Sequence, residues 1–193
     1  MQVNSLLSGK RFLHTVAAIL IITLLVIPCL PRVAGAVTAN EIDVSVSVAL
    51  ERFKNEVRGA REFLANAKGV LVLPNVVRVG FVLGGEYGEG ALLVGGETVD
   101  YYSITAGSLG FQFGVQSKNI VIVFMEESSL AQFRNSLGWK AGVDGSVVLV
   151  DYGAGTSVDS DNVRDPIVGF IFGLKGLMVN LSLEGAKFTK LAK

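Results

Sequence analysis

Four basic residues follow one another closely in the N-terminal half of the sequence, and their types suit phosphate binding. They are Lys54, Arg58, Arg61 and Lys68. In a helix, at about 100° per residue, the first three fall on one stripe beside an apolar seam, with Glu51 on its far flank. Guanidinium and ammonium groups pair with phosphate oxygens, and their long stems can lie along apolar surface. The pattern suits a membrane interface, but it is also the ordinary pattern of a solvated helix edge whose seam packs into its own domain.

Two groups of carboxylates could support other chemistry. Glu86 and Glu89 are close in sequence, and aspartates gather between residues 151 and 165. A carboxylate-based hydrolase could use either group, but acid–base catalysis needs two carboxyl groups whose pKa values are held apart. The aspartates could bind Ca²⁺, but their spacing lacks the helix-flanked signature of calcium loops. We expect surface carboxylates and a solvated acidic loop, with no catalytic residue and no metal.

Histidine and cysteine chemistry depends on two residues near the N-terminus. His14 is the only histidine and Cys29 the only cysteine, and both precede residue 37. If residues 1–36 are removed, the remaining chain has no imidazole and no thiol. Triads, cysteine nucleophiles, His/Cys zinc sites and disulfides are then excluded. The glycine-rich run GGEYGEG at residues 84–90 does not have the spacing of a nucleotide-binding loop, so no cofactor is expected.

The N-terminus has the pattern of an export signal. Lys10 and Arg11 precede an uncharged apolar run at residues 16–27, and the small residues AGA follow at 34–36. The run is shorter than the roughly 20 residues that span a bilayer. The pattern predicts a signal peptide at residues 1–36 and one exported domain at residues 37–193. An uncleaved anchor and lipid attachment at Cys29 remain as alternatives.

Charge limits the partners of the exported domain. Residues 37–193 keep 14 of the 17 basic residues and all 17 acidic ones, so their net charge is −3. A nucleic-acid partner is not expected from this charge. General attraction to anionic membranes is not expected either, so lipid binding needs a local basic cluster.

A helix must position the basic residues. Apolar residues repeat at helical spacing between residues 46 and 64, and Asn40 and Asn66 are fair end signals. The pattern predicts one continuous amphipathic helix, although residues 42–48 alternate and could instead be extended. The seam consists of Val46, Leu50, Phe53, Val57, Ala60 and Leu64.

Short apolar runs separated by glycine or asparagine fill the rest of the chain and predict strands. The runs lie at residues 70–73, 76–83, 91–94, 99–105, 109–115, 120–125, 143–150 and 167–172. Residues 84–90 are predicted as a hairpin or bulge and residues 117–119 as a turn. A short helix near residues 128–136, capped by Ser128 or Ser129, interrupts the strands. The predicted fold class is α+β: an N-terminal amphipathic helix packed on a curved, Gly-rich antiparallel sheet or barrel.

Several of these segments together resemble the SYLF domain family over residues 44–190. They are AKGVLVLP at 67–74, GGEYGEG at 84–90, YYS at 101–103, GSLGFQFG at 107–114, GLM at 176–178 and LEG at 183–185. Eukaryotic members of that family bind phosphoinositides and, in fungi, actin and its regulators. The signal segment and single domain make this chain similar to bacterial exported members, for which actin is not a partner.

The resemblance implies a non-enzymatic module that binds anionic phospholipid at the periplasm or cell envelope of a bacterium. Lys54, Arg58, Arg61 and Lys68 are the expected lipid-binding residues. A structural or protein-interaction role in the envelope, without lipid, is the main alternative, and a hydrolase is the weakest one.

Overall fold

The computed structural model of the protein describes residues 37–80, 83–109, 114–151, 165–176 and 182–193. The predicted signal peptide and most of the aspartate-rich stretch lie outside the described residues. Residues Thr38–Lys193 form one compact unit. The described side chains of two hydrophobic cores lie within that unit. The unit therefore has a hydrophobic core of its own, as an independently folding domain does.

The first helix, α2 (Ala39–Glu56), begins with a capping box. The Thr38 hydroxyl accepts from the Glu41 N–H at 3.3 Å, and the Glu41 carboxylate accepts from the Thr38 N–H at 2.8 Å. These two bonds satisfy amide groups that have no partner within the helix. The predicted cap at Asn40 is therefore wrong by two residues. The extended alternative for residues 42–48 is wrong too, since they are helical.

Replacing Thr38 by alanine is expected to lower the free energy of unfolding by about 1 kcal/mol, because the first turn loses its hydroxyl acceptor. Urea denaturation of residues 37–193, in which the Thr38 N–H remains an amide, measures this difference. Ser47→Ala is the matched control, because Ser47 is exposed within α2 and alanine favours helix. A Thr38→Ala variant as stable as wild type would contradict the capping role.

The predicted single helix is two helices. After α2 the backbone becomes extended at Val57, and Gly59 takes a left-handed conformation with φ +82° before α3 (Ala60–Asn66) begins. Glycine adopts this conformation at no steric cost. Val57 and Ala60 are both buried, so the apolar spacing continues across the break. The periodicity of the sequence therefore conceals the corner.

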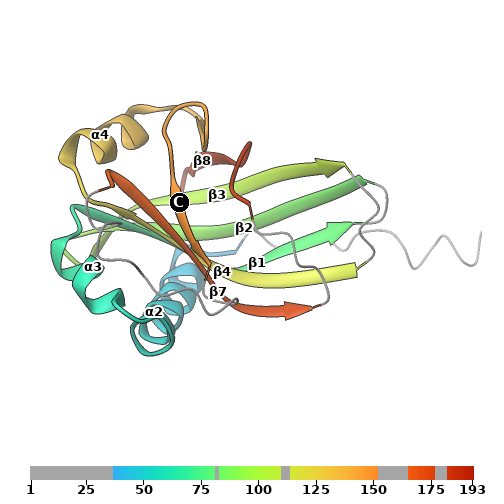
Figure 1. The fold of residues 1–193 in the computed structure, drawn as a ribbon, viewed down its shortest axis with the longest axis horizontal. Helices are drawn as coiled ribbons and strands as arrows, with labels where there is room; N and C mark the ends of the chain where they lie inside the picture. The colour runs from blue at the N-terminus through green and yellow to red at the C-terminus, as the bar shows by residue number, and fades with distance from the viewer. Residues whose placement is uncertain (1–36, 81–82, 110–113, 152–164, 177–181) are drawn as a thin grey trace, which may run out of the picture. The chain divides into compact units, whose positions relative to one another are not determined.

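Eight strands form one curled sheet in the order β5-β8-β3-β2-β1-β4-β7-β6 (Figure 1). All neighbours are antiparallel except β6 and β7, which are parallel, so the sheet is mixed rather than wholly antiparallel. A short helix, α4 (Glu127–Asn135), follows β4 close to the predicted position. Its N-cap is Glu126 rather than Ser128 or Ser129. The strands are β1 (Gly69–Gly80), β2 (Leu83–Val94), β3 (Glu97–Leu109), β4 (Gly114–Phe124), β5 (Trp139–Lys140), β6 (Val148–Asp151), β7 (Ile167–Gly176) and β8 (Lys187–Leu191).

Two predicted interruptions lie inside strands. Residues 70–73 and 76–80 are joined in β1 by a bulge, where the register shifts between Leu73 and Val76 and Asn75 has φ +49°. The predicted run at 76–83 is wrong at its end, because Leu83 belongs to β2. The predicted turn at residues 117–119 is wrong, because β4 continues through it. Residues 84–90 lie within β2, where Gly90 passes so close to β1 that a Cβ would collide with the Val72 carbonyl oxygen. Glycine is used there for close backbone approach, not for a turn.

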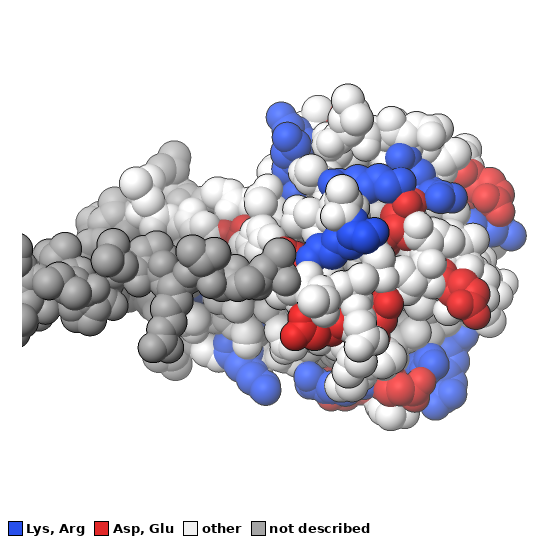
Figure 2. All heavy atoms as spheres, turned by 180° about the vertical axis from the view of Figure 1, so that it is seen from behind, with Lys and Arg blue, Asp and Glu red and all other residues white. Residues whose placement is uncertain are grey.

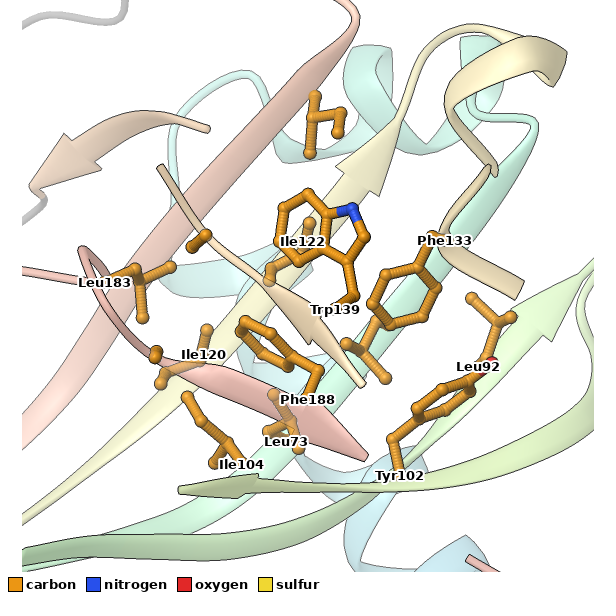
Figure 3. Close-up of a cluster of buried hydrophobic side chains, with 14 of the residues drawn as sticks. Leu73, Leu92, Tyr102, Ile104, Ile120, Ile122, Phe133, Trp139, Leu183 and Phe188 are labelled. Atoms are coloured by element: carbon orange, nitrogen blue, oxygen red, sulfur yellow. The ribbon is translucent and has the colours of Figure 1, made fainter. Parts of the chain in front are cut away.

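The sheet carries a core on each face. Helices α2 and α3 pack on one face, where Phe53 and Phe63 both meet Phe170 with ring centroids 5.0 Å apart. On the other face, Phe133 of α4 lies among aromatic side chains that include Trp139 (Figure 3). The N-terminal helix thus packs on a curved sheet and a short helix follows β4, as the sequence predicts.

Candidate functional site

The corner between α2 and α3 carries the predicted basic residues. The Val57 N–H donates to the Phe53 carbonyl at 3.0 Å, which closes α2, and the Phe63 N–H donates to the Gly59 carbonyl at 3.2 Å, which opens α3. Val57 is buried beneath the corner. Arg58 is consequently held at the exposed tip of the turn between two anchored helix ends.

Three of the four predicted basic residues share one surface depression. Lys54, Arg58 and Arg61 all line an open hollow of about 380 Å³ formed by residues 54–61. The helical stripe on which they were placed does not exist, because each comes from a different segment: α2, the corner and α3. The corner nevertheless brings them together. Three cations around one hollow suit an anion with several oxygens, such as a phosphate group.

Acidic neighbours reduce this positive charge. Lys54 pairs with Glu51 at 2.7 Å, although the single-helix interpretation put Glu51 on the far flank. The hydrogen bond from Lys54, then its charge and that of Arg61, hold the pKa of Glu51 below its ordinary value. Glu56, which also lines the hollow, pairs with Arg52 at 2.8 Å. Such exposed pairs are worth about 1 kcal/mol or less, so an incoming phosphate can displace Glu51 from Lys54.

An apolar groove adjoins the hollow. It has a volume of about 340 Å³ and lies among α2, α3 and the turn between β2 and β3. Leu50, Leu64 and Leu93 line it, and Lys54 lines both the groove and the basic hollow. The sequence interpretation included Leu50 and Leu64 as core seam and did not connect Leu93 to them. Leu93 reaches the groove only because β2 pairs with β1 beneath the helices, and the sequence does not show that pairing.

Lys68 stands apart from the other three basic residues. It follows α3, its backbone N–H donates to the Phe124 carbonyl at 2.8 Å, and its side chain is exposed. It lines neither the hollow nor the groove. Lys68 can therefore add to the local field but does not share the anion position.

The face opposite to that in Figure 1 has no uniform sign of charge. Figure 2 shows Lys and Arg interspersed with Asp and Glu over the described surface. Attraction of an anionic partner therefore depends on local clusters rather than on a charged face.

The two glutamates of β2, Glu86 and Glu89, do not lie together in one site. Glu86 is buried, whereas Glu89 points to the other face of β2 and accepts hydrogen bonds from the Tyr87 hydroxyl at 2.6 Å and Lys193 at 2.8 Å. The surface position expected for Glu86 is therefore wrong. Among the described residues, no group of three or more His, Cys, Asp or Glu side chains could hold a metal ion.

Glu86 instead forms an ion pair inside the sheet. Its carboxylate accepts from Lys118 of β4 at 3.0 Å, and the two side chains are 4% and 1% exposed. Arg78 and Gln116 lie beside them in register and are also buried. Burial on this scale indicates a structural role for these polar groups. The sequence analysis missed this ion pair because Lys118, which lies between two predicted strands, was assigned to a turn at residues 117–119.

Residues 105–192, from β3 to the C-terminal strand, match the protein-family model described as Ysc84, Las17-binding protein actin regulator. This match confirms the resemblance to the SYLF family, and its description fits a non-enzymatic binding module. The matched segment does not include α2, α3 or the basic hollow. No curated protein sequence matches the chain. Within the described part of the chain, no helix is long and apolar enough to cross a bilayer.

Proposed function

Because residues 105–192 match the Ysc84 family, we propose that the protein is a binding module whose α2–α3 corner takes the headgroups of anionic phospholipids. We further propose that it is exported and acts at the cell envelope of a bacterium. Lys54, Arg58 and Arg61 contact the phosphate, and Lys68 contributes charge nearby. No catalytic step is part of this function.

The observation that carries the proposal is the position of Lys54. It lines both the hollow that Arg58 and Arg61 share and the apolar groove of Leu50, Leu64 and Leu93. An anionic phospholipid has the same two parts in the same order, a phosphate linked through glycerol to acyl chains. A lipid with its phosphate at the hollow can therefore lay the first part of a chain in the groove.

The expected strength is modest and depends on salt. Each basic residue near an anionic leaflet contributes about 1 kcal/mol, so the three residues of the hollow give about 3 kcal/mol. The remainder of the domain opposes binding, since the net charge of residues 37–193 is −3. The cations lie on the surface, so dissolved salt screens their attraction to the anionic headgroups. The screening length falls from about 10 Å at 0.1 M salt to about 3 Å at 1 M.

Vesicle co-sedimentation of residues 38–193 tests this function. We expect binding to vesicles of phosphatidylcholine with phosphatidylserine, and a fall of about tenfold or more as salt rises from about 0.05 to 0.5 M. Vesicles of phosphatidylcholine alone are the control and are expected to bind much more weakly. Equal binding to both vesicles, or binding that salt does not change, would contradict a headgroup site.

A protein partner is the second candidate, because the family is described as binding a protein. In that case the leucine-lined groove would take an apolar side chain of the partner. Binding of a protein from the same envelope, with no sedimentation on any vesicle, would favour this function over the first.

A further inference from the structure

The ends of strands β1, β2 and β4 expose large apolar side chains at one end of the sheet. The strands extend beyond the helices there (Figure 1). Five residues contribute, each more than one third exposed: Val77 41%, Val79 53%, Leu83 71%, Tyr87 52% and Val115 61%. We name this set the strand-end face. Exposed apolar residues gathered in this way mark a contact surface more often than singly scattered ones do.

Pairing of the strands places all five on the same face of the sheet. Val77 pairs with Tyr87, and Val79 pairs with Val115. Leu83 lies four residues before Tyr87 on β2, and side chains alternate along a strand, so it points to the same side. This is the face that α2 and α3 cover nearer the other end, over Val72. The helices stop short of the strand-end face, and no other described element covers it.

The strand-end face is ordered by depth. Leu83 is outermost, and the next row holds Val79 and Val115 with two glycines. Those glycines, Gly85 and Gly107, have open space on this side, since a Cβ built on either would meet no heavy atom within 4 Å. Residues 79–85, which include both outer rows of β1 and β2, contain no charged residue.

The innermost row of the strand-end face is polar at its margins. Val77 and Tyr87 occupy its centre, with Thr105 on one side and Ser117 and Lys175 on the other. Rows on one face repeat about every 7 Å, because each residue of a strand rises about 3.3 Å. The two outer rows are thus about 7 Å apart, and hydroxyl and ammonium groups appear in the next row, about 13 Å from Leu83.

Tyr87 has the properties of an interfacial residue. Its hydroxyl donates to Glu89 at 2.6 Å, and this bond, together with burial, raises the pKa of Tyr87 to about 12, so the side chain is neutral. Glu89 also accepts from Lys193 at 2.8 Å, which balances the acid behind the tyrosine. An apolar ring with a bonded polar tip is enriched at the boundary between hydrocarbon and water.

From this ordering we propose that the strand-end face inserts its outer two rows into the acyl boundary of a phospholipid bilayer. The inference rests on the proposed membrane function and adds a second contact, distinct from the basic hollow. Interfacial elements enter a bilayer by about 5–10 Å, which agrees with the roughly 7 Å that the two outer rows span before the row of Thr105, Ser117 and Lys175. Tyr87 and Lys175 then lie at headgroup level.

Site-specific fluorescence tests the insertion. Residues 38–193 contain no cysteine, so a single cysteine can carry a polarity-sensitive dye. With vesicles of phosphatidylcholine and phosphatidylserine, we expect Leu83→Cys and Val79→Cys to show a blue shift and a several-fold rise in emission. Leu137→Cys is the matched control, since Leu137 is 97% exposed in the chain after α4 and should show no change.

A charged variant gives a second readout. Leu83→Glu with Val115→Glu alters only exposed side chains, so the fold is expected to persist. It should lose the part of vesicle binding that resists high salt, while Val143→Glu, at a 74% exposed position outside the strand-end face, should not. Unchanged salt-resistant binding would overturn the insertion.

The remaining outcomes separate the two contacts. Sedimentation with vesicles but no blue shift at Leu83 would overturn the insertion and leave the headgroup site intact. No sedimentation on any vesicle would overturn both. A blue shift that needs no vesicles and grows with protein concentration would assign the strand-end face to a second copy of the chain instead of lipid.

Discussion

Replacing Lys118 by methionine is expected to lower the free energy of unfolding by about 3–5 kcal/mol. Lys118 is the partner of Glu86 at 3.0 Å, and both side chains are almost wholly buried. The second oxygen of Glu86, Oε1, is buried with no hydrogen bond from the described residues. Without Lys118 the carboxylate would keep its burial and lose its compensating charge. Urea unfolding of residues 38–193 measures the loss.

Two further variants isolate the cause. Removing both charges, as Lys118→Met with Glu86→Leu, should recover most of the stability, because neither member of the pair then stays buried without the other. Arg52→Met breaks an exposed pair with Glu56 and should cost about 1 kcal/mol or less. A loss for Lys118→Met no larger than that of Arg52→Met would contradict the structural role of the buried pair.

The apolar seam allowed the first part of the fold to be predicted from sequence. Val46, Phe53, Val57 and Ala60 are buried as their spacing indicates. The same spacing could not reveal the break before Gly59, because the corner keeps Val57 and Ala60 on the buried side. A left-handed glycine within a periodic pattern is a local backbone state that side-chain periodicity does not report.

Strand identity was easier to predict than strand pairing. Glycine and asparagine divided the chain into runs that mostly became strands. The parallel pairing of β6 with β7 joins segments that are distant in sequence, and no local pattern encodes such a pairing. Lys118 illustrates the same limit, because its partner Glu86 lies on a strand that it meets only through β1.

The candidate site was predictable in its residues and not in its shape. Spacing predicted that Lys54, Arg58 and Arg61 lie together, and the corner brings all three to one hollow. The adjoining groove needs Leu93, which comes from the end of β2, so it depends on tertiary structure. Lys68 was grouped with the others by closeness in sequence, and the structure places it outside the hollow.

Reversing the three charges of the hollow, as Lys54→Glu/Arg58→Glu/Arg61→Glu, is expected to weaken binding to anionic vesicles by about a hundredfold or more. Each cation contributes about 1 kcal/mol near an anionic surface, and about 1.4 kcal/mol corresponds to a factor of ten. The substituted carboxylates add repulsion to that loss. Circular dichroism of the variant should remain unchanged, since Arg58 and Arg61 are exposed and Lys54 is only partly covered.

A control with the same change in net charge makes this measurement decisive. Lys140, Lys187 and Lys190 are exposed on β5 and β8, away from the hollow, and are reversed together in the control variant. In co-sedimentation with vesicles of phosphatidylcholine and phosphatidylserine, we predict that the control variant binds nearly as wild type does. The variant of the hollow should bind no better than wild type binds to phosphatidylcholine alone. Equal binding by the hollow variant and wild type would contradict the claim that the α2–α3 corner is the headgroup site.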